Sequence, residues 1–294
     1  MKIFKEFPNQ LPEFKYLNGI ESPKDLKLLE EDQLVELADE LREFLLHSVS
    51  KTGGHFGAGL GTIELTIALH YVLDMPFDKI VWDTGHQAYP HKILTGRREK
   101  MHLMRKKGGI HPFPSITESE YDAMSVGHSS TSISASLGMN EANVHLSTRR
   151  NIFSVIGDGA MTAGIAFEGM MHAAHLDNNL NIILNDNDMS ISKNTGGLSD
   201  YLAKVWASKS YKKLKSSGKK VLKNLPGGLH ISRNLKDGLK HAVMPGNLFE
   251  DLGLHYIGPI DGHDIPLLIK TIRRMVEKKE PYFCLLYTSP SPRD

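Results

Sequence analysis

The stretch "SVIGDGAMTAG", residues 154–164, places a single carboxylate, Asp158, between two glycines at the end of an apolar run. Gly157 permits a sharp exit from a strand, and Gly159 lets the backbone approach a ligand closely. A helix that begins here directs free N–H groups and the positive end of its dipole at one point, which favours phosphate. Because a carboxylate repels phosphate, we expect a divalent cation between Asp158 and a diphosphate group.

Magnesium prefers six oxygen ligands, so one aspartate is too few. After the next apolar run, "NIILNDND", Asn187 offers an amide oxygen and Met189 a backbone carbonyl. Asn187 follows Asp158 by about 30 residues, the usual length of a strand, crossover helix and adjacent strand, so the two side chains are predicted at neighbouring strand tips. Asp186 and Asp188 are alternative ligands or turn caps. A Gly-Asp-Gly triplet taken alone is usually only a capped turn.

Strand-like runs alternate with helical patterns along the chain. "KIVWDTGHQ", "RRNIFSVIGDG", "LNIILNDND" and "HYIGPI" are the strand candidates. Leucines at three- and four-residue steps predict a helix in "DQLVELADELREFLLHSV", and further helices are expected in "GTIELTIALHYVL", "GHSSTSISASLGMNEANVHL", "TAGIAFEGMMHAAHL" and "IPLLIKTIRRMVEKK". This alternation predicts an α/β fold, a doubly wound and mostly parallel sheet with helices on both faces, whose ligands collect at the carboxyl ends of the strands.

Composition narrows the class of protein. The chain has 294 residues, 40% of them hydrophobic, and a formal net charge of +1, which favours a globular protein without a global field for nucleic acid or a membrane surface. Cys284 is the only cysteine, so no disulfide forms within the chain. Neither a signal peptide nor a membrane span of about 20 apolar residues is recognisable. We expect a soluble, cytoplasmic protein.

Residues 204–240 are crowded with lysine. A nucleic-acid patch is conceivable, but the stretch has few aromatic residues for stacking on bases. A solvated pair of helices or a mobile excursion is the favoured interpretation, and no binding role is assigned to it.

Glycine precedes histidine at several positions, and three of these, His55, His86 and His128, are expected in loops near the carboxyl edge of the sheet. Any one such histidine is ordinarily a surface residue or a satisfied core group. Three such loops that converge on a phosphate site are more informative, because imidazoles can transfer protons and donate hydrogen bonds to phosphate oxygens near neutral pH.

Several motifs together resemble the N-terminal part of the 1-deoxy-D-xylulose-5-phosphate synthase family, whose members depend on thiamin diphosphate. The likeness runs from about Pro12 to about Tyr282. The Gly-Asp-Gly triplet with a distant asparagine is shared by thiamin diphosphate enzymes generally, whereas "GHQAYPHKILTGRR" and "NDNDMSIS" favour this family over transketolase. The other motifs that carry the resemblance are "GHFGAGLGTIELTIALHYV", "GGIHPFPS", "SVGHSSTSISASLGM" and "GDGAMTAGIAFEGM".

The resemblance implies roles for individual residues. Magnesium would be held by Asp158, Asn187 and the carbonyl of Met189, and His55 matches a histidine implicated in proton transfer. The residues that would line thiamin diphosphate are His86, Gly127, His128, Ser129, Gly159, Ala160 and Asn187. Members of the family condense pyruvate with glyceraldehyde 3-phosphate, releasing carbon dioxide and supplying 1-deoxy-D-xylulose 5-phosphate for isoprenoid, thiamin and pyridoxal synthesis. The resemblance also implies a homodimer for the complete enzyme.

Domain boundaries follow from the same resemblance. Residues 1–283 are expected to form the diphosphate-binding domain, with a lysine-rich excursion at about 194–245. Residues 284–294, "CLLYTSPSPRD", are expected to be an aberrant or truncated tail, because serine and proline do not extend a central strand comfortably. We expect the chain to lack the pyrimidine-binding and C-terminal domains of the family, and therefore to be inactive alone. Alternatives are one chain of a split transketolase-like enzyme and a noncatalytic phosphate-binding remnant.

Overall fold

The computed structural model describes residues 8–176, 179–187, 197 and 247–288. Met189 lies outside the described residues, as does the lysine-rich stretch expected at about 194–245 apart from Gly197. None of the helices in the described ranges is long and apolar enough to cross a bilayer.

The core of the fold is a five-stranded sheet in the order β1-β2-β3-β5-β4, in which every neighbouring pair is parallel. The carboxyl ends of the strands therefore lie along one edge. The strands are β1 (Lys79–Trp82), β2 (Ile152–Gly157), β3 (Asn181–Asp186), β4 (His255–Asp261) and β5 (Tyr282–Tyr287).

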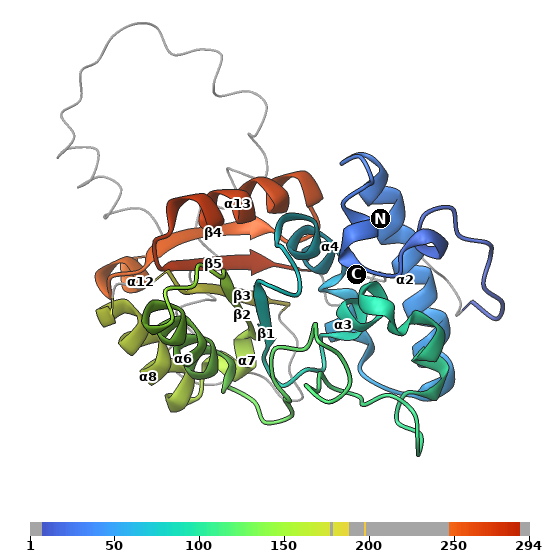
Figure 1. The fold of residues 1–294 in the computed structure, drawn as a ribbon, viewed down its shortest axis with the longest axis horizontal. Coiled ribbons are helices and arrows are strands. Elements are labelled where there is room, and N and C mark those ends of the chain that lie inside the picture. The colour runs from blue at the N-terminus through green and yellow to red at the C-terminus, as the bar shows by residue number, and fades with distance from the viewer. Residues whose placement is uncertain (1–7, 177–178, 188–196, 198–246, 289–294) are drawn as a thin grey trace, which may run out of the picture.

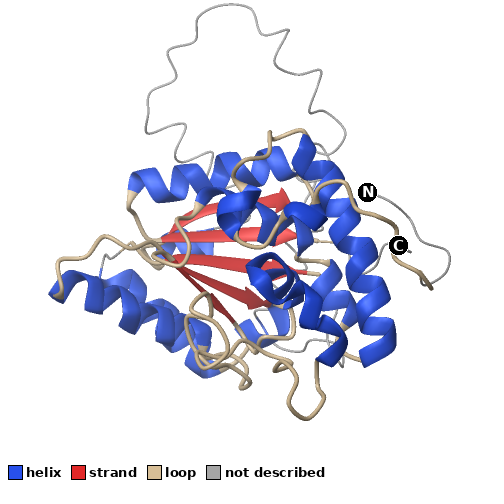
Figure 2. Ribbon diagram, turned by 45° about the vertical axis from the view of Figure 1, so that its right-hand side comes forward, coloured by secondary structure: helices blue, strands red, loops and turns tan. Residues whose placement is uncertain are grey.

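Helices cover both faces of this sheet (Figures 1 and 2). The longer ones are α2 (Gln33–Thr52), α4 (Ile63–Val72), α6 (Ser132–His145), α8 (Gly164–Leu176) and α13 (Ile265–Lys278). The short ones are η1 (Leu17–Gly19), α1 (Pro23–Leu26), α3 (Phe56–Leu60), α5 (Tyr89–Lys92), η2 (Ile93–Arg97), η3 (Arg98–Leu103), α7 (Asp158–Met161) and α12 (Asn247–Asp251).

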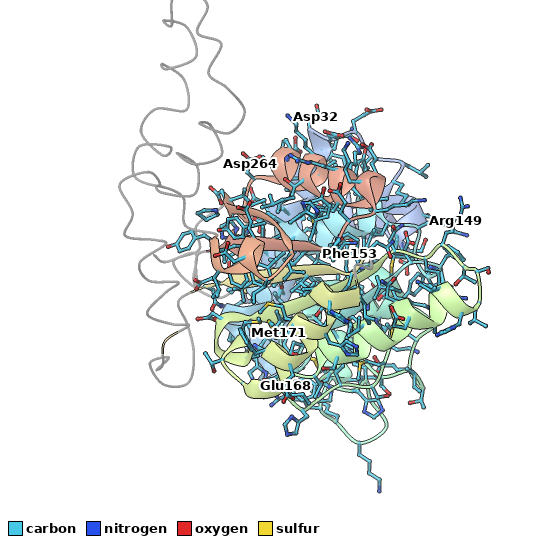
Figure 3. The ribbon with its side chains drawn as sticks, turned by 90° about the vertical axis from the view of Figure 1, so that its left-hand side faces the viewer. Asp32, Arg149, Phe153, Glu168, Met171 and Asp264 are labelled. Atoms are coloured by element: carbon cyan, nitrogen blue, oxygen red, sulfur yellow. The ribbon has the colours of Figure 1, made fainter. Side chains whose placement is uncertain are left out.

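Alternate residues of the central strands enter two separate apolar cores. Phe153 and Val155 of β2 join the core that contains α2, α4 and α13, whereas Ile152 and Ile156 join the core that contains α6 and α8. In Figure 3, Phe153 lies within the body of the molecule. Strands buried on both faces read as continuous apolar runs, as β2 does. The expected doubly wound α/β fold is confirmed.

The principal helices lie where their patterns predict. Leu34, Leu37, Leu41 and Leu45 of α2 are fully buried on one face, and the helix ends at Gly53, whose φ of 72° is left-handed. Helix α4 is apolar on most sides and is buried accordingly. Helix α8 instead leaves Met171 40% exposed on its outer face, where Figure 3 labels it with Glu168.

The end of the chain differs from the sequence-based expectation. Residues 284–294 were expected to be a tail outside the central strand, yet β5 runs through Tyr287 and lies between β3 and β4. Cys284 to Tyr287 therefore belong to the sheet. The expectation gave weight to the later serines and prolines, whereas the strand is formed by the apolar residues that precede them. The amide of Thr288 still donates to the carbonyl of Asp186, at 3.0 Å.

The place of β5 in the sheet makes a testable stability prediction. Leu285 is fully buried in the core formed with α6 and α8, so Leu285→Ala should lower the free energy of unfolding by about 2–5 kcal/mol in urea titrations. The control is Leu28→Ala, because Leu28 is 81% exposed and its truncation should change stability by no more than about 0.5 kcal/mol. Equal small effects would mean that residue 285 is not part of the core.

Helices α4 and α5 are joined by two fully buried histidines. Nε2 of His70 lies 2.9 Å from Nδ1 of His91, and the rings stack with centroids 5.1 Å apart. Burial lowers the pKa of both residues, and the positive charge of Arg97 adds to the effect. Both rings are therefore neutral at pH 7.

Stability should depend on pH through this pair. A lowered pKa in the folded state means that the unfolded chain binds protons first as the pH falls through 6.5, so the stabilisation is complete above that pH and declines below it. We expect His70→Gln to reduce the slope of unfolding free energy against pH, between pH 6.5 and 5, by up to about 1.4 kcal/mol per unit. Denaturant unfolding at several pH values measures this, and identical slopes in variant and wild type would contradict it.

Candidate functional site

The tips of β2 and β3 lie side by side at the carboxyl edge. Their register pairs Gly157 with Asn185, so Asp158 follows one tip directly and Asn187 lies just beyond the other. Both side chains are nearly buried, at 7% and 8% exposure. The prediction that these residues follow neighbouring strand tips is confirmed, while their role as magnesium ligands stays a prediction.

A short helix lies between the tip of β2 and the long helix that was expected to follow it. Helix α7 spans only Asp158 to Met161, and the long helix α8 begins at Gly164. A single turn carries little dipole, so the pull on phosphate expected from a long helix is weaker here. Gly159 and Ala160 therefore lie in a single helical turn at the tip of β2.

Two of the three predicted histidines come together. The ring centroids of His55 and His86 lie 5.6 Å apart, and Phe113 lies 6.2 Å from His55. His55 is the N-cap residue of α3, and its backbone N–H donates to the Tyr89 hydroxyl at 3.4 Å. His86 follows the sharp turn after β1, and its Nδ1 is buried without a hydrogen-bond partner among the described residues.

Both histidines of this pair are less basic than free histidine. Burial lowers the pKa of His55, and the positive charge of Arg105 lowers it further. Burial likewise lowers the pKa of His86, helped by His55 and opposed by Asp83. Both rings are therefore neutral at pH 7, a state in which each can accept a proton.

The third loop reaches the same place through Phe113. A Cβ added to Gly127 would meet Phe113 at 3.8 Å, so this loop packs on the ring that also contacts His55. His128 and Ser129 are exposed, and Nδ1 of His128 donates to the carbonyl of Ser129 at 2.9 Å. The structure thus brings together the loops of His55, His86 and Gly127, with His128 turned to its own backbone.

Asp83, at the end of β1, ties two of these loops together. Its Oδ1 accepts from the backbone N–H of Ser130 at 2.7 Å and from the Thr84 hydroxyl at 3.1 Å, and its Oδ2 accepts from Ser132 N–H at 3.1 Å. Thr84 and Ser130 have left-handed φ values of 58° and 71°, a strained conformation for residues with a side chain. One buried carboxylate therefore holds both turns.

Sequence reasoning missed Phe113, Asp83 and Arg105. An aspartate directly after the apolar run of β1 was an available signal for Asp83. No local sequence pattern predicts that Phe113 lies against His55, because that contact joins loops that are distant in sequence. His263 also follows a glycine, but it lies away from these loops in the sequence. Its Nδ1 lies 2.9 Å from Oε2 of the buried Glu64 in α4.

Two further observations bear on the site. Among the described residues, no group of three or more histidine, cysteine, aspartate or glutamate side chains could hold a metal ion. A cavity of about 540 Å³ lies at the amino ends of the strands, lined in part by Arg149, Arg150 and Lys279. It contains none of the predicted site residues, so the candidate site stays at the carboxyl edge.

Known protein sequences resemble the chain closely. The sequence model of 1-deoxy-D-xylulose-5-phosphate synthase matches residues 17–288. The 1-deoxy-D-xylulose-5-phosphate synthase of Pseudomonas fluorescens (strain Pf0-1) is 56% identical over 285 residues, which cover 97% of this chain and 45% of that protein. The synthase of Stutzerimonas stutzeri (strain A1501) is 55% identical over 287 residues, covering 98% and 45%. The chain thus spans less than half the length of these relatives.

Solved structures show the same fold at lower identity. Transketolase from Leishmania mexicana has a TM-score of 0.62 and 16% identity, with 87% of this chain and 36% of that chain covered. Transketolase from Campylobacter jejuni has a TM-score of 0.61 and 19% identity, with 88% and 38% covered. At such identities the likeness concerns the fold.

The close packing of the loops can be tested at Gly85. A Cβ there would meet Val126, Phe113 and Pro114 at 2.7–2.8 Å, whereas Gly253, with the same φ of 97°, has its nearest neighbour at 3.6 Å. Gly253→Ala should therefore cost only the left-handed strain of about 1–2 kcal/mol. Gly85→Ala should cost about 1–3 kcal/mol more from overpacking.

Denaturant unfolding measures both variants, and NMR of the His55 and His86 rings reports the local change. We expect the ring resonances to move only in Gly85→Ala. Equal unfolding free energies and unmoved resonances in the two variants would show that the three loops are not packed as described.

Proposed function

The chain belongs to the 1-deoxy-D-xylulose-5-phosphate synthase family, and from this membership we propose that the carboxyl edge of its sheet binds thiamin diphosphate through magnesium. The proposed metal ligands are Asp158, Asn187 and the carbonyl of Met189. The observation that carries the proposal is the β2–β3 register, which puts Asp158 and Asn187 at adjoining strand tips. Carboxylate and amide oxygens are ligands that suit Mg²⁺.

The residues at this edge fit such a cofactor. Nδ1 of His86 is buried and has no partner among the described residues, so a polar ligand atom there would satisfy it. A Cβ added to Gly157 would meet nothing within 4 Å, which leaves open space beside the tip of β2. In the proposal the cofactor is lined by His86, Gly127, His128, Ser129, Gly159, Ala160 and Asn187.

Thiamin diphosphate supplies, when bound, the means to stabilise the carbanion left by decarboxylation of a 2-keto acid. The chain's own residues have simpler tasks. Asp158 and Asn187 would hold the dication and through it the diphosphate, and the amides at Gly159 and Ala160 lie close to the same tip. His55 is proposed as the proton-transfer group, because its lowered pKa keeps the ring neutral and able to accept a proton near pH 7.

The whole reaction is proposed for the full-length family protein. There, pyruvate and glyceraldehyde 3-phosphate would give 1-deoxy-D-xylulose 5-phosphate and carbon dioxide in isoprenoid, thiamin and pyridoxal synthesis. The chain covers 45% of its relatives, and the diphosphate-binding domain is proposed to extend beyond the expected boundary at residue 283, to the end of β5 at Tyr287. We expect no condensation by the 294-residue chain alone. Homodimerisation and a cytoplasmic location belong to the same proposal.

Cofactor titration tests the metal site directly. The chain should bind thiamin diphosphate in the presence of Mg²⁺ and much more weakly in EDTA, as followed by calorimetry. Asn187→Ala should weaken the Mg²⁺-dependent affinity about tenfold or more by removing a metal ligand. The matched control is Asn181→Ala, which removes the same side chain at the amino end of β3 and should leave the affinity unchanged.

The outcomes separate the proposal from its alternatives. Equal affinity with and without Mg²⁺, or equal effects of the two asparagine variants, would contradict the metal site. Turnover of pyruvate with glyceraldehyde 3-phosphate by the purified chain would show that the matched part of the family protein is sufficient for the reaction.

A further inference from the structure

The segment between η3 and α6, residues 104–131, contains neither a helix nor a strand, and the structure describes all of it. Parts of it are nevertheless buried, including Ser115 and Asp122. Buried backbone N–H groups need acceptors, and here no helix or sheet supplies them. Asp122, of the segment itself, takes that role for the buried N–H of Ser115, and Glu118 accepts from the exposed N–H of His111.

Asp122 uses both oxygens. Its Oδ2 accepts from the backbone N–H of Ser115 at 2.8 Å and from Arg97 at 2.7 Å. Its Oδ1 accepts from the second guanidinium nitrogen of Arg97 and from Nε2 of His91, both at 2.9 Å. Burial alone would raise the pKa of Asp122, but the hydrogen bonds from His91 and Arg97 outweigh it and hold the pKa well below its ordinary value.

Glu118, four residues before Asp122, likewise uses both oxygens to accept hydrogen bonds. Its Oε2 accepts from the backbone N–H of His111 at 2.6 Å, and its Oε1 from Arg97 at 2.9 Å and from Lys92. Lys92, Arg97, Glu118 and Asp122 together form what we call the carboxylate clasp. It contains two cations and two anions, so the charges balance within the protein.

The clasp grips the backbone on both sides of Phe113. His111 lies two residues before this ring and Ser115 two residues after it, and each amide is held by one of the carboxylates. The later part of the segment is also bound next to Phe113, because Val126 N–H donates to the carbonyl of Pro114 at 3.2 Å. The clasp thus fixes the position of residues 111–115, which we call the wall. Phe113 of the wall packs on His55, and Phe113 and Pro114 lie against Gly85.

The buried histidines His70 and His91 connect the clasp to α4, and the positions of their protons follow from their hydrogen bonds. Since a carboxylate only accepts, Nε2 of His91 carries the proton that is donated to Asp122. Nδ1 of His91 is then an acceptor and receives the Nε2 proton of His70. Nδ1 of His70 is left unprotonated and has no partner among the described residues. The hydrogen bonds from His70 to His91 and from His91 to Asp122 therefore fix the position of residues 104–131 relative to α4 and α5.

A purely stabilising role explains this arrangement poorly. Buried ion pairs contribute little net stability, and apolar residues of similar size usually serve as well. What charged groups provide here is acceptors for particular amides of an irregular segment, and hence a fixed position for it.

We propose that Asp122 is a positioning residue, through which the carboxylate clasp holds Phe113 and Gly127 against His55 and His86 at the candidate site. The inference rests on the proposed function for its cofactor, and on the geometry alone for the placement of the wall. The segment also carries Arg105, whose charge lowers the pKa of His55 together with burial. Release of the segment should therefore be visible in the titration of His55.

The test compares Asp122→Asn with Asp78→Asn in the 294-residue chain. Asp78 is a buried carboxylate at the amino edge, where it accepts from the backbone N–H groups of Asn151 at 2.7 Å and Asp74 at 2.8 Å. Each change removes a buried charge that holds backbone amides, but only Asp122 is joined to the segment at the site. Hydrogen exchange by mass spectrometry and NMR titration of labelled histidine, assigned with His55→Gln, are the readouts.

In Asp122→Asn we expect faster exchange across residues 111–129 and a His55 pKa that rises toward 6.5, its ordinary value. Affinity for thiamin diphosphate with Mg²⁺ should fall about tenfold or more, as for a misplaced binding group. In Asp78→Asn, at a comparable loss of thermal stability, His55 should titrate as in the wild type. If Asp122→Asn does not fold, Glu118→Gln provides the same comparison, because its side chain is 10% exposed and its amide oxygen still accepts from His111.

An unchanged His55 titration and unchanged exchange in Asp122→Asn, or in Glu118→Gln where that variant replaces it, would overturn the proposal. So would the same changes in Asp78→Asn. A shifted His55 titration in a chain whose wild type shows no Mg²⁺-dependent affinity would support the positioning role and remove the proposed function.

Discussion

The parallel pairing of β2 with β3 is the contact on which the candidate site depends. Its register aligns Gly157 with Asn185, and a slip of one residue would turn every side chain of a strand to the opposite face. Both strands are buried on both faces, with Phe153 and Val155 in one core and Ile182 and Leu184 in the other. Apolar packing along the strands therefore decides where the polar groups at their ends lie.

This dependence explains what could be predicted from the sequence. Strands β1 to β4, the principal helices and the adjoining tips at Asp158 and Asn187 follow from periodicity and spacing, which are local properties. The strand at Tyr282–Tyr287 was not predicted, because the serine and proline residues after it were given too much weight. The expected helix in "TAGIAFEGMMHAAHL" is α8, but the single turn α7 that separates it from the tip of β2 was not predicted. The contact of Phe113 with His55 joins separate loops, and only the tertiary fold determines it.

Carboxylates hold the backbone of the loops at this edge. Asp83 accepts from the amides that lead into α6, and Asp122 and Glu118 accept from the amides that flank Phe113. A carboxylate can serve several donors at once, and it specifies their direction as well as their distance. A sheet of this kind does not by itself determine chemistry. Its specific properties arise in the loops that these carboxylates hold.

The charge state of the edge explains why a diphosphate would need a cation there. His55 and His86 have lowered pKa values and are neutral at pH 7, so neither contributes positive charge. The carboxylate clasp balances its own charges, and the chain as a whole has a net charge of only +1. Asp158 is an acidic side chain at the very tip where a phosphate would approach, and α7 is too short for its dipole to compensate. The positive charge of Arg105 acts on His55, whose pKa it lowers together with burial. A diphosphate beside Asp158 would therefore need a counter-charge, and the dication proposed to lie between Asp158 and Asn187 would supply it.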